Sequence, residues 1–89
     1  MLLPSAAPAP IVMALAQVLR LRRKALGLTQ RALADRCGLS SRHISHLETC
    51  RYQPTLATLD RLAIGLELRL SDLVQETERG MARHTGGTP

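Results

Sequence analysis

The chain has 89 residues, a formal net charge of +5 and a single aromatic residue, Tyr52. A chain of this length forms one small domain, and aliphatic side chains must fill its core. No apolar run approaches the roughly 20 residues that cross a bilayer, so we expect no membrane segment. The two cysteines, in a chain whose start lacks the features of a signal peptide, indicate a reducing cytoplasm and no disulfide framework.

The two ends of the chain are expected to lie outside the folded domain. Residues 1–10 contain Pro4, Pro8 and Pro10 and are predicted to be a disordered leader. Residues 11–79 are expected to form the domain. Residues 80–89 end in Gly-Gly-Thr-Pro, which predicts a flexible tail.

Three helices are predicted in the first half of the chain. The first covers about residues 11–26 and is ended by Gly27, which can adopt the left-handed conformation at a helix C-terminus. The second begins after Thr29, whose hydroxyl can cap free backbone N–H groups, and it stops at Gly38. The third follows from Ser40, another capping hydroxyl, and ends at residue 48 or 49.

Two further helices complete an all-α prediction without a confident strand. The fourth covers residues 55–66, where apolar residues recur at helical spacing, at Leu56, Leu59, Leu62, Ala63 and Leu66. Ser71 is expected to cap a fifth helix that fades near Arg79. The fold class is therefore a compact five-helix domain.

The second and third predicted helices have the layout of a helix-turn-helix. They are short, they are separated by a turn at residues 37–39, and a capping hydroxyl precedes each. In this arrangement the second helix of the pair is held rigidly, so that its outer face can enter the major groove of DNA.

Positive charge is concentrated on the same segment. Residues 20–51 carry eight basic and two acidic side chains, a balance of +6, whereas residues 52–78 carry two basic and five acidic, a balance of −3. A basic face of this kind is typical of phosphate binding. The alternative, an arginine-rich surface that serves only solubility, does not explain why the charge coincides with the motif.

The third helix separates polar and apolar side chains. At about 100° per residue, one face carries Arg42, Ser45, His46 and Thr49. The opposite face carries Ile44 and Leu47, with Glu48 beside them. Arginine can bond guanine O6 and N7 together, and serine can donate or accept, so the polar face suits contacts with base edges.

Residues 19–73 resemble the Cro/repressor-type helix-turn-helix family, the xenobiotic-response-element class of bacterial and phage regulators. Several spaced elements carry this resemblance: Arg23, Gly27-Leu28-Thr29-Gln30, Leu33-Ala34, Gly38, Ile44-Ser45, Leu47-Glu48, Pro54, Leu56, Thr58-Leu59 and Leu62-Ala63. The resemblance implies a five-helix domain that binds a pseudo-palindromic operator as a dimer.

The resemblance also implies roles for individual residues. Gln30 opens the second helix and contacts the phosphate backbone. Arg23 and Glu48 match a pair that forms an internal salt bridge between the first and third helices. A partly buried acid needs such a partner in any case. The DNA-facing positions of the recognition helix are Ser40, Ser41, Arg42, Ser45 and His46.

Three positions depart from the family pattern. Ala32 leaves the capping box of the second helix half made. Cys50 stands where glycine is common, and it is strained by roughly 1 kcal/mol if the backbone there needs a positive φ. Arg22 falls where many members are apolar, so it either shifts the inner face of the first helix or adds a phosphate contact.

Other chemistry finds little support in the sequence. Cys37, His43, His46 and Cys50 can be drawn as a metal site, but their spacing matches no common zinc pattern, and Cys37 lies on the inward stripe of its helix. Cys50 is either a redox-sensitive thiol or a tolerated small residue. No paired carboxylates, nucleophile–base pair or glycine-rich phosphate loop is found, so we expect no enzyme, metal or cofactor.

The sequence therefore predicts a sequence-specific DNA-binding transcriptional regulator, most simply a repressor of bacterial or phage origin. It is expected to act in the cytoplasm as a homodimer, associated with the nucleoid. Base edges are expected to contact Ser41, Arg42, Ser45 and His46. Phosphates are expected to contact Arg22, Gln30, Ser40 and Arg51.

Two alternatives remain open at this point. The chain can be the DNA-binding antitoxin of a toxin–antitoxin pair, in which the fifth helix or the tail masks a toxin. It can also be an interaction module that uses the same scaffold without binding DNA, which predicts no salt-dependent DNA binding.

Overall fold

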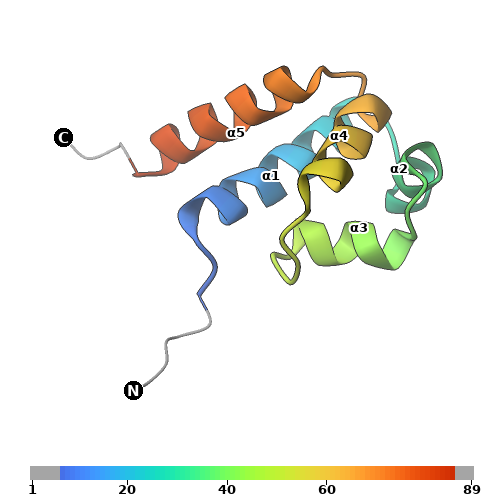
Figure 1. Cartoon of the computed structure of the whole chain (residues 1–89), viewed down its shortest axis with the longest axis horizontal. Helices are drawn as coiled ribbons and strands as arrows, with labels where there is room; N and C mark the ends of the chain where they lie inside the picture. Colours follow the sequence, from blue (N-terminus) through green and yellow to red (C-terminus); the bar gives the residue numbers. More distant parts are fainter. Residues whose placement is uncertain (1–6, 86–89) are drawn as a thin grey trace.

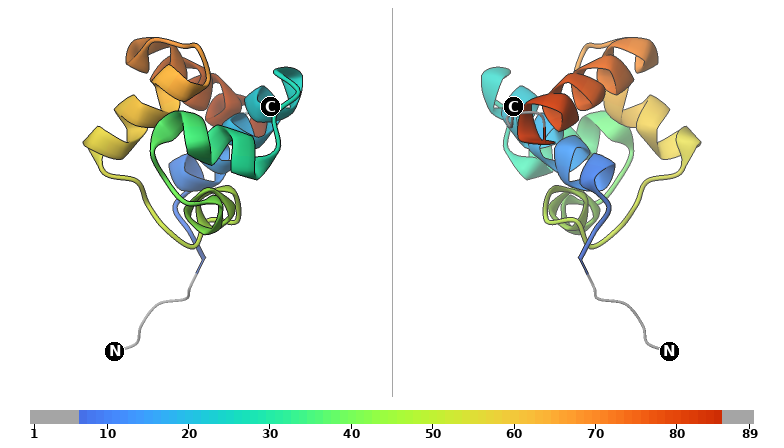
Figure 2. Two further views of the ribbon diagram at one scale, coloured as in Figure 1. Left: turned by 90° about the vertical axis from the view of Figure 1, so that its right-hand side faces the viewer. Right: turned by 90° about the vertical axis from the view of Figure 1, so that its left-hand side faces the viewer.

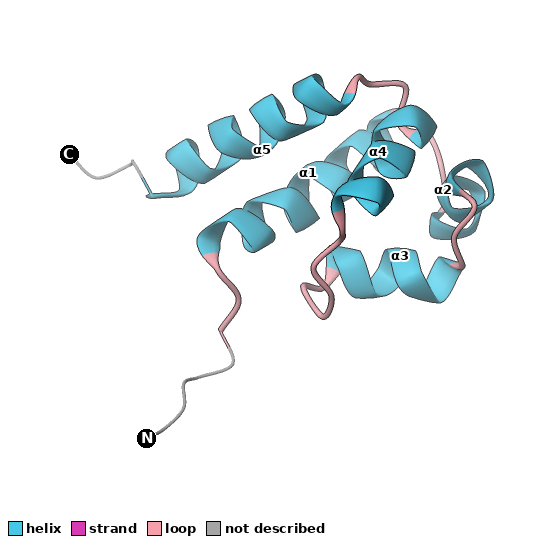
Figure 3. Cartoon of the chain, in the orientation of Figure 1, coloured by secondary structure: helices cyan, strands magenta, loops and turns pink. Residues whose placement is uncertain are grey.

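The computed structural model describes the chain from residue 7 to residue 85, with side chains described up to residue 82. Five α-helices make up this part: α1 (Pro10–Ala25), α2 (Gln30–Cys37), α3 (Ser41–Glu48), α4 (Leu56–Gly65) and α5 (Leu70–Thr85). Figure 3 shows them joined by short loops, with no strand between residues 7 and 85. The all-α, five-helix prediction is confirmed. Most of the expected leader and the last four residues of the expected tail, residues 1–6 and 86–89, lie outside the described residues.

Side-chain hydroxyls cap three of the helices. The Oγ1 of Thr29 accepts a hydrogen bond from the N–H of Ala32 at 3.0 Å, and the Oγ of Ser40 accepts one from His43 at 3.0 Å. Thr55 caps α4 in the same way. These bonds satisfy backbone donors that have no partner within the helix. The caps predicted at Thr29 and Ser40 are confirmed.

The predicted cap of the last helix is wrong. Helix α5 begins at Leu70, so Ser71 already lies in its first turn, and the Asp72 carboxylate accepts the bond from the N–H of Arg69 at 3.2 Å. The helix also continues to Thr85, six residues beyond Arg79, where fading was expected. Figure 1 shows the reason: α5 lies along α1 over much of its length, so packing extends a helix that local signals alone would end earlier.

Left-handed residues end four of the helices. Gly27 has a φ value of 72°, as predicted, and Gly38, where the second helix was expected to stop, has a φ value of 71°. Cys50 and Glu67 occupy the corresponding positions after α3 and α4 with φ values of 64° and 62°. A side chain in this conformation costs about 1–2 kcal/mol. The strain expected at Cys50 is therefore present, and it is repeated at Glu67.

The core is aliphatic and draws on all five helices. Its largest fully buried side chains are Leu19, Leu33, Ile44, Leu62, Leu66 and Leu73. Cys37 is also buried and packs within this cluster, as a small apolar residue would. Leu56, the first residue of α4, is by contrast largely exposed.

The other helices pack on two opposite sides of α1. Helix α5 lies on one side of α1, and α3 lies on the other (Figure 1). Helix α2 packs on α3 and α4, so the α2–α3 pair is fixed to the rest of the domain. None of the described helices has the combined length and apolar character that crossing a bilayer requires.

Candidate nucleic-acid interface

The α2–turn–α3 unit positions the candidate interface. The left-handed Gly38 reverses the chain after α2, and the N–H of Leu39 donates to the carbonyl oxygen of Ala34 at 2.9 Å. Ser40 then starts α3. Ile44 and Leu47 bury the inner face of α3, while its other side lies at the lower edge of the molecule in Figure 1. An α-helix supported from one side in this way can fit into a major groove.

The outer side of α3 carries the side chains expected to contact bases. Arg42 and Thr49 are exposed, and Ser41 and Ser45 are half-buried. The hydroxyl of Thr49 donates back to the carbonyl oxygen of Ser45 at 2.8 Å, so Thr49 serves the end of the helix. Arg42 has no ion-pair partner among the described residues, which leaves its guanidinium available for an outside ligand.

His46 is more enclosed than the sequence suggested. Its Nδ1 is buried and has no hydrogen-bond partner within the described part of the chain. The ring of Tyr52 lies nearly perpendicular to the ring of His46, with 4.8 Å between centroids, and 5.6 Å from the ring of His43. Tyr52 was not among the predicted site residues. The sequence did contain a signal for this contact: Tyr52 is the chain's one aromatic residue, and it lies six residues after His46.

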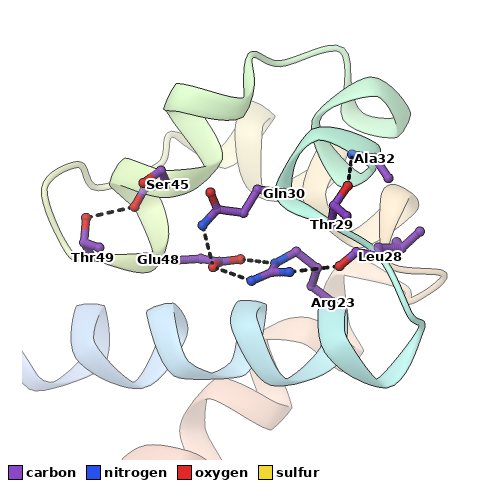
Figure 4. A network of polar contacts seen from close by, with 8 residues as sticks. All are labelled: Arg23, Leu28, Thr29, Gln30, Ala32, Ser45, Glu48 and Thr49. Carbon is purple, nitrogen blue, oxygen red and sulfur yellow. Dashed lines mark hydrogen bonds and ion pairs between the residues drawn. The ribbon is translucent and has the colours of Figure 1, made fainter.

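A buried ion pair supports α3 from behind. The Nε of Arg23 donates to Oε2 of Glu48 at 2.7 Å, and a second guanidinium nitrogen donates to Oε1 at 3.0 Å (Figure 4). Only 10% of the Arg23 side chain and 4% of the Glu48 side chain are exposed. The hydrogen bond to Glu48 raises the pKa of Arg23, which burial alone would lower. This pair is the one that the sequence led us to expect, and it ties α1 to the end of α3.

Gln30 joins this ion pair. Its side-chain amide donates to Oε1 of Glu48 at 3.1 Å, as Figure 4 shows. Arg23 also donates to the backbone oxygen of Leu28 at 2.9 Å. Glu48 therefore receives bonds from α1 and from the first residue of α2. The phosphate contact assigned to Gln30 stays a prediction. The hydrogen bond to Glu48 orients the Gln30 side chain.

Arg22 does not lie where the sequence analysis placed it. Its Nε donates to the carbonyl oxygen of Leu66 at 3.0 Å, and the residue lines a hollow together with Asp72 and Glu76 of α5. Successive helical residues point about 100° apart, so Arg23 facing α3 turns Arg22 toward α4 and α5. The free carbonyl at the end of α4 provides a partner for the cation. A phosphate contact beside α3 is incompatible with this placement.

Half of the basic residues between positions 20 and 51 are engaged within the protein. The contacts of Arg22 and Arg23 are described above. The Arg36 guanidinium donates to the carbonyl oxygen of Gly65 and forms an ion pair with Glu67 at 3.0 Å. The Arg31 guanidinium lies 3.8 Å from the Asp35 carboxylate. The remaining four have no ion pair among the described residues and are exposed; they are Arg20, Lys24, Arg42 and Arg51. The electrostatic footprint available to phosphate is therefore smaller than the sequence count implied.

The cysteines and histidines do not assemble into a metal centre in the described residues. Cys37 lies in the core, and burial raises the pKa of its thiol. Cys50 is half-buried at the end of α3, where its Sγ lies 4.0 Å from the backbone oxygen of Val12. A buried thiol with a raised pKa is a poor nucleophile and a poor metal ligand, so Cys37 has a packing role.

Comparisons with known proteins agree with this arrangement. A helix-turn-helix family model matches residues 19–73. An immunity repressor protein of Bacillus phage phi105 is 36% identical over 64 residues, which cover 72% of this chain and 44% of the repressor. This chain thus spans less than half the length of that relative. An uncharacterized HTH-type transcriptional regulator of Methanothermobacter thermautotrophicus is 45% identical over 49 residues, which cover 55% of this chain and 71% of the regulator.

Solved structures show the same fold. The clp gene regulator ClgR of Corynebacterium glutamicum superposes with a TM-score of 0.79 and 28% identity, covering 85% of this chain and 81% of ClgR. The restriction-modification controller protein C.AhdI of Aeromonas hydrophila superposes with a TM-score of 0.67 and 29% identity, covering 70% of this chain and 94% of C.AhdI. The chain belongs to the helix-turn-helix family, which confirms the resemblance drawn from the sequence.

Proposed function

We propose that this member of the helix-turn-helix family is a DNA-binding transcriptional regulator that places α3 in the major groove of an operator. One observation carries the proposal. Helix α3 is held on its inner side by Ile44, Leu47 and the buried ion pair of Glu48, while Arg42 on its outer side has no protein partner among the described residues. The family and the names of its relatives, which include repressors and regulators, support the same conclusion.

The residues of the interface divide by the chemistry that they can offer. Arg42 suits guanine O6 and N7, and Ser41, Ser45 and His46 can bond neighbouring base edges. Ser40, Gln30 and Arg51 flank the helix and suit phosphate oxygens, which fix the register on the duplex but carry no sequence information. Arg22 has no part in this division, because it bonds Leu66 on the other side of α1.

A single recognition helix makes few base contacts, so we propose that two copies bind together. A two-fold dimer presents two α3 helices to half-sites one DNA turn apart, about 34 Å. We further propose repression as the outcome, on the support of the phage relative's name. Binding to DNA would place the protein in the cytoplasm, associated with the nucleoid. A toxin partner is the alternative, and a toxin that co-purifies with the chain would favour it.

Binding measurements on operator variants test the division of labour. Arg42→Ala is expected to weaken binding to the preferred sequence by about 1–3 kcal/mol and to reduce discrimination at one base pair of each half-site. Arg51→Ala is expected to weaken all sequences alike and to lower the slope of log affinity against log salt by about 1.

Arg79→Ala is the matched control, because it removes an exposed arginine of α5, on the opposite side of α1 from α3. It should leave both discrimination and salt slope unchanged. Identical behaviour of the Arg42 and Arg51 variants would contradict the proposal, as would equal losses in all three.

A further inference from the structure

We propose that Tyr52 is a positioning residue of the recognition surface. Its ring covers the inner nitrogen of His46 and keeps the proton on the outer nitrogen, so that His46 meets DNA as a hydrogen-bond donor. This inference rests on the proposed function and deepens it, because it names the kind of base atom that His46 contacts. Neither residue belongs to the aliphatic core, and their contact joins α3 to the loop that follows it.

The end of α3 brings this loop back toward the helix. Cys50 has a left-handed backbone, with a φ of 64°, and the N–H of Arg51 donates to the carbonyl oxygen of His46 at 2.8 Å. This is the bond pattern of a Schellman motif, which satisfies a free carbonyl at a helix end. Tyr52 therefore starts beside the last turn of α3. In the left view of Figure 2, the loop leaves α3 at the lower edge and rises along the flank where α4 lies.

Three rings meet on this flank of α3. The Tyr52 ring lies nearly perpendicular to both imidazoles, with its centroid 4.8 Å from that of His46 and 5.6 Å from that of His43. The two histidines are three residues apart and so are neighbours on the helix surface. Edge-to-face packing at such distances is a preferred arrangement of aromatic rings. Tyr52 is 50% exposed, so this contact holds its ring at the surface of the domain.

Tyr52 supports α3 on the side away from the buried ion pair. Glu48 lies two residues after His46 and points to nearly the opposite side of the helix, at about 100° per residue. The ion pair encloses Glu48 there. Around the helix axis, Arg42 and Ser45 lie between these two supports. The outer face of α3 is therefore held from both of its flanks.

The two ring nitrogens of His46 have different surroundings. Nδ1 is buried and has no hydrogen-bond partner in the part of the chain that the structure describes. Nε2 is not enclosed, and it also forms no hydrogen bond among those residues, so an outside group can reach it. A neutral imidazole carries a proton on one nitrogen and a lone pair on the other. Because a buried N–H without an acceptor is rarer than a buried acceptor without a donor, the proton belongs on Nε2.

A proton on Nε2 limits what His46 can recognise. As a donor it can bond N7 or O6 of guanine, N7 of adenine or O4 of thymine, but not the exocyclic amines of adenine and cytosine. An imidazole that turns freely can instead bring Nδ1 outward and offer either nitrogen in either role. The Tyr52 ring opposes that rotation, so it selects a single donor geometry for the reading of base edges.

NMR of the free protein tests the tautomer without DNA. Protonated and bare ring nitrogens differ widely in chemical shift, and comparison with His46→Ala identifies the signals of His46. At a pH where the ring is neutral, the wild type should carry its proton on Nε2. Tyr52→Leu opens Nδ1 to water and should give a mixture of both tautomers, whereas Tyr52→Phe keeps the ring and should restore the wild-type spectrum.

Gln53→Ala is the matched control for these spectra. It changes an exposed residue of the same loop and should leave the His46 signals as they are in the wild type. A proton on Nδ1 in the wild type would overturn the proposal. So would the same single tautomer in Tyr52→Leu, because Tyr52 would then have no part in the choice.

Binding to operator variants tests the consequence for recognition. His46→Ala is expected to lose discrimination several-fold at one base pair of each half-site. Tyr52→Leu should lose part of the same discrimination, and Tyr52→Phe should keep it to within about twofold. The double variant Tyr52→Leu/His46→Ala should lose no more than His46→Ala alone. Losses that add in the double variant would show that Tyr52 acts independently of His46 and would overturn the proposal.

Base analogues at that pair identify the atom that His46 contacts. Removal of an acceptor, which is N7 or O6 of a purine or O4 of thymine, should weaken binding of the wild type several-fold and leave His46→Ala unaffected. Removal of an exocyclic amine should affect neither protein. A loss that follows removal of the amine alone would show that Nε2 accepts a hydrogen bond, which contradicts the proposal.

Failure of this inference can be told from failure of the proposed function. If the wild type binds no specific DNA, the proposed function fails whatever the spectra show, and the reading role of His46 fails with it. If Arg42→Ala loses discrimination while His46→Ala discriminates as well as the wild type, the proposed function stands and this inference alone is wrong.

Discussion

The two faces of α3 differ in how completely their polar groups are partnered. On the inner face, Glu48 receives hydrogen bonds from Arg23 and Gln30 and is almost fully enclosed. On the outer face, Arg42 is exposed without an ion-pair partner among the described residues. A buried charge needs its partners for the fold to be stable, whereas an exposed one contributes little to stability. Changes on the inner face should therefore alter stability, and changes on the outer face should alter binding.

The largest expected effect is on the inner face. Glu48→Ala leaves the Arg23 guanidinium buried without its carboxylate, which should lower the free energy of unfolding by about 3–5 kcal/mol. Glu48→Gln is the matched variant, since it keeps the shape and one acceptor oxygen, and it should lose less. Urea unfolding followed by circular dichroism measures both. Unchanged stability with abolished DNA binding in Glu48→Ala would reverse the roles that we assign to the two faces.

The contact that fixes α2 against α4 should be nearly as sensitive. A Cβ on Gly65 would lie 2.5 Å from the Sγ of Cys37 and 3.3 Å from the Cδ1 of Leu33. Gly65→Ala should therefore lower stability by about 1–3 kcal/mol through overpacking. Cys37→Ala removes the sulfur, so the double variant should be more stable than the sum of the single changes predicts. Additive losses would show that the sulfur is not the obstacle.

The smallest effect is expected at the end of α3, and it should be stabilising. Cys50 has the same left-handed conformation after α3 that Gly27 has after α1. Cys50→Gly relieves the strain but loosens the unfolded chain, for a net gain of about 0.5–1 kcal/mol. Gly27→Ala is the opposite change at the equivalent position and should destabilise, although nothing lies within 4 Å of the added Cβ. Thermal unfolding of both variants tests these two predictions. If Cys50→Gly lost as much stability as Gly27→Ala, the backbone at Cys50 would not be strained.

Local chemistry explains which parts of the fold were predictable. Thr29 and Ser40 each stand directly before a helix, and their short side-chain hydroxyls can accept from a free backbone N–H of the first turn. Gly38 suits the positive φ with which α2 ends. The cap was expected at Ser71, whereas α5 begins at Leu70 and the Asp72 carboxylate, two residues into the helix, accepts from the N–H of Arg69. The length of α5 depends on packing against α1, which local signals do not contain.

The site was predictable where it depends on helix geometry and not where it depends on tertiary contacts or on the conformation of a loop. The inner face of α3 follows from the spacing of Ile44 and Leu47, which the structure buries as expected. Arg22 bonds the carbonyl oxygen of Leu66, which is 44 residues away in the chain, so no local pattern in the sequence indicates this partner. The contact of Tyr52 with His46 depends on the conformation of the loop after α3, which the sequence left undetermined.

The central claim is that the outer face of α3 recognises specific DNA. Selection of bound sequences from a random duplex pool tests it most directly. The account predicts enrichment of a pseudo-palindromic site whose half-site centres lie about 10 base pairs apart, in keeping with two α3 helices one DNA turn apart. Recovery of no enriched sequence, with binding that depends on salt alone, would contradict it.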